Sequence, residues 1–232
     1  MKRMICLLLC LVSTAAVAQV GQIDKTYPFT GQELDLEVAL GSRISITAWN
    51  KPEISVKIVY KINGGKDNDA VKVDLDDYKD RLAIDIDLDD RKLQRSEYCC
   101  CEEEDGVYVS RSKRKSGCLE LWVEIMAPTE ADVRIETVIA DAVLKGMSGN
   151  VEIESVTGLI DIAWVESHGA SVNMKSVNGD LYTNLELKSS SKDGLRQISG
   201  HDVRGQYKNG ERKVKLETVT SDIYFRKPTG KD

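Results

Sequence analysis

The sequence predicts an all-β protein. Apolar and polar residues alternate over most of the chain, and no segment after residue 18 has helical periodicity. The second half also repeats a six-residue pattern at near-constant spacing. Together these observations favour short strands that share one core.

The first eighteen residues have the three parts of a secretory signal peptide. A basic start precedes an apolar run over residues 5–12, and Ala16-Val17-Ala18 forms a small-residue cleavage site. The apolar run is too short to cross a bilayer as a helix. We therefore expect export, removal of residues 1–18 and a working chain of residues 19–232 that begins at Gln19.

Charge and composition exclude several classes of protein. Removal of Lys2 and Arg3 with the leader lowers the formal net charge from −6 to −8, which disfavours nucleic acid as a partner. No later segment approaches the ~18 apolar residues that indicate a transmembrane helix. The hydrophobic share of 41% is enough for a packed core. We expect one β domain that binds no cofactor.

Six stretches between residues 34 and 125 have apolar residues at every second position, which is typical of strands with one buried face. The intervening residues are mostly charged or hydroxylated, as a solvated face requires. Gly41, Gly64-Gly65 and Asn50-Lys51-Pro52 predict turns. The stretches are residues 34–40, 44–48, 54–62, 71–75, 82–88 and 119–125.

Residues 133–225 form a repeat region. Five units share apolar residues at positions one, three and six, except that the fourth begins with Asp193. The last positions of the units are 18, 21, 21 and 21 residues apart, and a small residue follows two positions later. The units end at Val138, Val156, Val177, Ile198 and Val219.

This repeat predicts a β-solenoid or β-roll, similar to a right-handed β-helix, with repeats of about 21 residues. Each coil would contain a strand, a bend at the small residue and a second strand, and successive coils would pair about 4.8 Å apart. The alternative is a β-sandwich with evenly spaced hairpins. The apolar positions expected to point inward are Val133, Ile135, Val138, Val151, Ile153, Val156, Val172, Met174, Val177, Leu195, Ile198, Val214, Leu216 and Val219.

A charged, cysteine-rich insert over residues 90–117 interrupts the alternating pattern. In an exported protein we expect a disulfide between Cys118 and one of Cys99, Cys100 and Cys101. Four cysteines allow three complete pairings, and the sequence does not choose among them. A metal or redox site is the alternative, but the Cys-x-x-Cys spacing of zinc sites and a nearby histidine are both missing. We expect the insert to project from the β body and to be dispensable for folding.

Several segments resemble the bacterial "putative adhesin" domain family. Gly41–Val56 is similar to the opening of these domains, and Ser176–Leu181 and Thr218–Ile223 are similar to their repeats. The resemblance covers residues 34–225 apart from the cysteine-rich insert. It implies a secreted or envelope-associated β-solenoid, and it brings no catalytic residues with it.

We therefore expect a non-enzymatic, adhesin-like protein of the cell envelope, located in the periplasm, on the cell surface or outside the cell. Its partner would be an envelope protein or a surface glycan. The alternative is a secreted carbohydrate-active enzyme, a polysaccharide lyase or hydrolase on a β-helix scaffold. The sequence contains no nucleophile elbow, phosphate loop or zinc-protease helix.

The enzyme alternative depends on three candidate catalytic residues, Asp180, His201 and Asp222. Each lies three residues after the end of a repeat unit, so successive coils would place them roughly 5 Å apart in that order. Such a column could perform acid–base chemistry. The competing interpretation is ordinary turn chemistry, because aspartate after glycine or serine is common in turns. Trp49, Trp122 and Trp164 are expected in or over the core rather than as a sugar-stacking platform.

Overall fold

The computed structural model describes residues 20–89, 91–93, 106–112, 115–189 and 201–229. These residues form sixteen strands and two short 3-10 turns, η1 (Asn63–Gly65) and η2 (Asn68–Ala70), and no α-helix occurs among them. The expectation of an all-β fold is therefore confirmed. The predicted signal peptide, residues 1–18, lies outside the described residues, as do Cys99, Cys100 and Cys101.

The strands follow one another along the whole chain. They are β1 (Gly21–Pro28), β2 (Glu33–Trp49), β3 (Glu53–Ile62), β4 (Val71–Asp77), β5 (Arg81–Leu88), β6 (Val107–Ser112), β7 (Lys115–Pro128), β8 (Val133–Lys145), β9 (Val151–Thr157), β10 (Ile160–Ala163), β11 (Ala170–Ser176), β12 (Leu181–Thr183), β13 (Lys188–Ser189), β14 (His201–Tyr207), β15 (Arg212–Thr218) and β16 (Ile223–Arg226).

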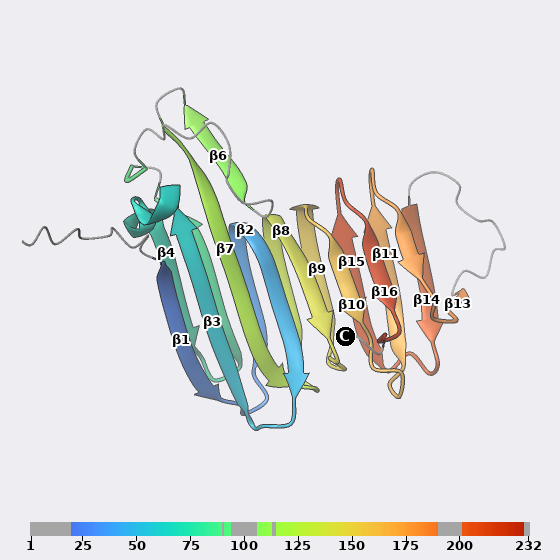
Figure 1. The fold of residues 1–232 in the computed structure, drawn as a ribbon. Coiled ribbons are helices and arrows are strands. Elements are labelled where there is room, and N and C mark those ends of the chain that lie inside the picture. Colours follow the sequence, from blue (N-terminus) through green and yellow to red (C-terminus); the bar gives the residue numbers. More distant parts are fainter. Residues whose placement is uncertain (1–19, 90, 94–105, 113–114, 190–200, 230–232) are drawn as a thin grey trace, which may run out of the picture.

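Strand pairing arranges these elements in two rows that share the long strands β2 and β8. The first row runs β4-β5-β2-β8-β9-β15-β11-β14-β13, and the second runs β1-β3-β7-β2-β8-β10-β16-β12. Figure 1 shows the strands standing side by side from β1 to β14. The sheet does not close on itself.

β2 passes from one row to the other at a bend. Its pairing with β8 shifts register between Leu40 and Arg43, and Gly41 lies inside this shift. A Cβ atom at Gly41 would lie 3.1 Å from a methyl carbon of Leu121, so the bend packs too closely for a larger residue without adjustment. The glycine therefore serves close packing of the two rows at the corner.

One hydrophobic core lies along the inner faces of both rows. The alternating apolar residues of β2 are fully buried on both sides of the bend, as are the apolar residues of β10 and β16. Trp164 and Phe225 pack together at its end, with ring centroids 5.7 Å apart. Trp164 is thus a core residue, as expected.

Four repeat units pair in parallel and in register. Val133 pairs with Val151, Val151 with Val214 and Val214 with Val172. Their order in space is therefore not their order in the sequence, because β15 lies between β9 and β11. The chain reaches this position from β14, which runs antiparallel to β11 on its other side. The fourth unit, residues 193–198, lies outside the described residues.

In the four units that the structure describes, the prediction that the third apolar position points inward is wrong. Val138, Val156, Val177 and Val219 are 46%, 45%, 57% and 39% exposed. Strand side chains alternate between faces, so a residue five positions after a buried one must face outward. The preceding residues, Thr137, Ser155, Ser176 and Thr218, are buried instead.

The predicted insert over residues 90–117 contributes to the fold at both of its ends. Leu93 is buried in the core, and β6 forms an antiparallel hairpin with the start of β7. In Figure 1 this hairpin extends beyond the body of the sheet. Cys118 is buried at its base, and its backbone N–H donates a hydrogen bond to Asn63 Oδ1 at 3.1 Å. A deletion that spares the described core must therefore keep Leu93 and the β6–β7 pairing.

Candidate functional site

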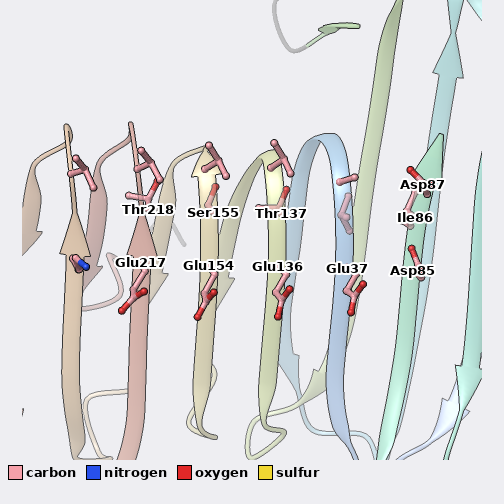
Figure 2. A pocket seen from close by; sticks show the side chains of 17 residues that line it. Glu37, Asp85, Ile86, Asp87, Glu136, Thr137, Glu154, Ser155, Glu217 and Thr218 are labelled. Atoms are coloured by element: carbon pink, nitrogen blue, oxygen red, sulfur yellow. The ribbon is translucent and has the colours of Figure 1, made fainter. Parts of the chain in front are cut away.

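A shallow groove of about 650 Å³ crosses the outer face of the first row of strands. Residues of β5, β2, β8, β9, β15 and β11 line it, so it runs across the strands rather than along them. Figure 2 shows acidic side chains on successive strands of this face, all pointing to the same side. Two rows of side chains, one acidic and one apolar, define the groove.

The acidic row consists of Glu37, Glu136, Glu154 and Glu217. Parallel pairing aligns Glu37 with Glu136, Glu136 with Glu154 and Glu154 with Glu217. In-register neighbours on adjacent strands lie about 4.8 Å apart, so the glutamates form a line across four strands. The row continues to Asp85 on β5, which pairs with Glu37, and ends at Lys175 on β11, which pairs with Glu217.

The apolar row consists of the exposed residues Val138, Val156, Val219 and Val177, in spatial order. Three of these valines follow a glutamate of the acidic row by two positions, and Val177 follows Lys175 in the same way. Alternation along a strand therefore places the two rows on the same face, about 6.6 Å apart. A contiguous exposed apolar patch bordered by charge is typical of an interaction surface.

Ion pairs neutralise only part of the acidic row. Arg134 pairs with Glu136, and the Lys215 ammonium donates hydrogen bonds to Glu154 at 2.5 Å and to Glu152 at 2.9 Å. The hydrogen bond from Lys215 holds the pKa of Glu154 below its ordinary value, and the same contacts raise the pKa of Lys215. Glu37 and Glu217 make no ion pair with any residue that the structure describes.

Three buried hydroxyl groups also line the groove, from Thr137, Ser155 and Thr218. Thr137 pairs with Ser155, and Ser155 pairs with Thr218, so the hydroxyls are neighbours on three adjacent strands. None of the three hydroxyl oxygens has a hydrogen-bond partner in the described part of the chain. A buried hydroxyl without a partner is destabilising, typically by about 1–3 kcal/mol.

The predicted groups Asp180, His201 and Asp222 lie together, but not in the predicted order. The backbone N–H of Asp180 donates to Asp222 Oδ1 at 2.8 Å, and His201 Nε2 lies 3.7 Å from Asp180 Oδ1. Asp180 is therefore the central member, because β12 is the neighbour of β16 and β14 begins beside the end of β11. The side chains of Asp180 and His201 are 63% and 49% exposed. The acid–base role of the three residues stays a prediction.

An aromatic pair adjoins this cluster. Tyr182 stacks on Tyr224 with ring centroids 4.6 Å apart, and its hydroxyl donates to Asp180 Oδ2 at 3.3 Å. Asp222 accepts a backbone hydrogen bond, which is a turn-stabilising role that needs no substrate. Sequence reasoning did not identify the tyrosines because their pairing depends on the placement of β16 beside β12.

Among the residues that the structure describes, no three His, Cys, Asp or Glu side chains are grouped so that they could hold a metal ion. The predicted disulfide between Cys118 and Cys99, Cys100 or Cys101 stays a prediction, because its candidate partners lie outside the described residues. Within the described ranges, no helix has the length and apolar character needed to span a bilayer.

The groove was not predicted from the sequence, although the repeat units contain the pattern that would have indicated it. The fourth and sixth positions of each repeat unit share one strand face, because they are two residues apart. Those positions are Glu136 and Val138 in the first unit, and Glu154 and Val156 in the second. Counting alternate positions along each strand, rather than apolar character alone, would have placed these valines on the outer face of the sheet.

A solved structure of a "putative cell adhesion protein" from Clostridium sporogenes is similar to this chain. It has 9% sequence identity and a TM-score of 0.50, and the similarity covers 90% of this chain and 100% of that chain. Identity this low shows a shared fold alone.

Two further solved structures, each a "putative adhesin", come from Parabacteroides merdae and Bacteroides fragilis. Both share 9% sequence identity with this chain. The similarity to the Parabacteroides merdae structure has a TM-score of 0.23 and covers 70% of this chain and 68% of that chain. The similarity to the Bacteroides fragilis structure has a TM-score of 0.24 and covers 90% of this chain and 97% of that chain. No protein-family model and no curated protein matches the sequence.

Proposed function

We propose that this chain is an exported, non-enzymatic, adhesin-like protein whose grooved β face binds a component of the cell envelope. The observation that carries the proposal is the exposed row of Val138, Val156, Val219 and Val177 beside the acidic row. Valine side chains are usually buried in the core, but these four are exposed. Because they are aligned across four strands, they form one continuous apolar contact surface. The protein would act in the periplasm or on the cell surface.

The architecture of this surface would be a β-solenoid or β-roll. Its support is the parallel, in-register pairing of the repeat units in both rows of strands. Ile160 pairs with Ala142 and with Ile223 in the second row, as Val151 pairs with Val133 and Val214 in the first. A stack of this kind presents identical positions of successive units along a line, which suits binding of an elongated partner.

A carbohydrate-active enzyme is the second candidate, and the contact of Asp180 with both Asp222 and His201 favours it. The binding proposal has the stronger support because the groove offers a long surface, whereas these three residues lie on an exposed bend. Loss of polysaccharide-degrading activity in an Asp180→Asn variant would favour the enzyme.

Affinity capture from native envelopes tests the binding proposal. Immobilised wild-type protein should retain a partner that a Val156→Thr/Val219→Thr variant loses, while a Val20→Thr variant, changed at an exposed valine outside the groove, should retain it. Equal retention by all three proteins would contradict a role for the groove. N-terminal sequencing of exported protein tests export, and a chain that still begins at Met1 would contradict it.

A further inference from the structure

We propose that the groove binds a cationic amphipathic α-helix of a partner protein, laid across β8, β9, β15 and β11 with its N-terminus toward β5. This inference rests on the proposed binding function and specifies the chemistry of the partner. It follows from three features of the groove: the spacing of its rows, its unpaired negative charge and the asymmetry of its two ends.

The spacing of the rows matches the dimensions of a helix. From Val138 to Val177 the apolar row spans three strand spacings, about 14 Å, which is the length of a helix of about ten residues. One helical turn rises 5.4 Å, close to the strand spacing of about 4.8 Å, so each strand can meet one turn of the helix. The apolar and acidic rows, about 6.6 Å apart, both lie under a helix about 10 Å wide.

The apolar row requires an apolar stripe on the partner. Val156 and Val219 occupy its middle, on the neighbouring strands β9 and β15, and both are exposed by more than a third. A helix with one apolar residue per turn would cover them, in the manner of an amphipathic helix that binds in a groove. A purely polar polymer would leave the valines in water.

The acidic row selects a cationic partner. Glu37 and Glu217 have no ion-pair partner among the described residues, and Asp85 and Asp87 extend the negative charge at one end. Lysine or arginine residues on the helix stripe next to the apolar one would meet these carboxylates. The same charge repels anionic lipid surfaces and nucleic acid, and it repels the identical face of a second copy of this chain.

The two ends of the groove differ in charge, which orients the helix. Asp85 and Asp87 stand at the β5 end, whereas Lys175 replaces a glutamate at the β11 end. A helix carries partial positive charge at its N-terminus and partial negative charge at its C-terminus. The favourable orientation therefore directs the N-terminus toward β5 and places the C-terminus beside Lys175.

A defined peptide tests the partner chemistry. The probe is a synthetic helical peptide of about 15 residues with one leucine per turn and lysines on the adjacent stripe, and binding to the exported protein is measured by calorimetry. We expect saturable one-to-one binding that weakens between about 0.05 M and 0.5 M salt. A peptide of the same composition in scrambled order and a peptide with glutamate in place of lysine serve as controls, and neither should bind.

Two sets of variants test the groove. Glu37→Gln/Glu217→Gln and Val156→Thr/Val219→Thr should each weaken binding of the peptide roughly tenfold. Glu130→Gln/Glu186→Gln, which removes the same charge from exposed positions outside the groove, should leave it unchanged. A photo-crosslinker at the peptide N-terminus should label residues 85–87, and one at its C-terminus should label residues 175–177.

The outcomes separate this inference from the proposed function. Absence of peptide binding, equal binding by the control peptides or insensitivity to both groove variants would overturn the helix proposal. Binding of spermine as tight as that of the peptide, and unaffected by the valine changes, would also overturn it. If the groove valines are nevertheless needed for capture from native envelopes, the proposed function stands and only the partner chemistry fails.

Discussion

Lys215 on β15 donates a hydrogen bond from its ammonium group to Glu154 on β9, at 2.5 Å, although 61 residues separate the two in the sequence. The contact exists because the last repeat unit lies between the second and third units and pairs with both of them. The contact can therefore form only when β15 lies beside β9, so its presence reports the order of these strands in space. Its loss should be measurable as a change in stability that depends on pH.

The first prediction concerns Lys215→Met. The variant should be less stable than the wild type at pH 7 by about 0.5–1 kcal/mol, a small value because more than a third of the lysine side chain is exposed. The pKa of Glu154 is lowered in the folded state, so its contribution is complete above the ordinary glutamate pKa of about 4.3 and is lost as the pH falls below it. Urea unfolding at pH 7 and pH 3 checks this, and a stability difference that grows at pH 3 would contradict it.

The second prediction compares one chemical change on the two faces of β9. Val151→Thr places a hydroxyl in the core and should lower the free energy of unfolding by about 1–3 kcal/mol. Val156→Thr makes the same change at an exposed site and should stay within about 0.5 kcal/mol of the wild type. Chemical denaturation of both variants checks the faces, and equal losses would mean that the side-chain assignment is wrong.

Local patterns predicted the strands well because a buried face imposes its period on the sequence. The alternation at Leu34, Leu36 and Val38, and at Ile54, Val56 and Ile58, corresponds to fully buried residues in β2 and β3. Errors arose where a residue was assigned to the core because it is apolar, without counting whether its position in the strand points inward or outward. Val138 and Val156 were assigned to the core because they are apolar, although alternation from Val133 and Val151 places them outside.

The order of the strands could not be predicted from spacing. Equal intervals of 21 residues suggested successive coils, but they do not say which unit lies beside which. The antiparallel return through β14 places β15 between β9 and β11, so Asp180 rather than His201 becomes the middle of its cluster. The same long-range pairing aligns Glu154 with Glu217 and creates the acidic row.

The third prediction concerns the hydroxyl groups without partners. Thr218→Val removes a buried hydroxyl of nearly the same shape and should raise the free energy of unfolding by about 1 kcal/mol. Ser176→Ala is the matched control, because the Ser176 hydroxyl donates to the Ser221 carbonyl at 3.0 Å and accepts from the Gly179 N–H at 2.8 Å. This variant should be destabilised by about 1 kcal/mol. Thermal and urea unfolding check both signs, and destabilisation by Thr218→Val would indicate that its hydroxyl has a partner.

The last prediction concerns the base of the β6–β7 hairpin, where Asn63 fixes the backbone beside Cys118. Asn63 is buried with a positive φ of 50°, and its side chain accepts a hydrogen bond from the Cys118 N–H and donates one to Asp67 Oδ2 at 2.6 Å. A Cβ atom at position 117, next to Cys118, would lie 2.7 Å from the Asn63 amide oxygen, so only glycine fits there without adjustment. This packing holds the Cys118 backbone in one place, and we predict a bridge from Cys118 to one of Cys99, Cys100 and Cys101.

Non-reducing peptide mapping of natively exported protein should therefore find a cross-linked peptide that contains Cys118, and four free thiols would refute the bridge. Cys118→Ser should lower stability by about 3 kcal/mol, because the bridge would close a loop of about 17 residues. Replacement of residues 94–105 by a short Gly-Ser linker retains Leu93 in the core and the β6–β7 pairing, so this variant should keep a cooperative melt. A variant that melts without cooperativity would instead mean that the segment supports the core, because only the loss of core contacts would abolish a two-state transition.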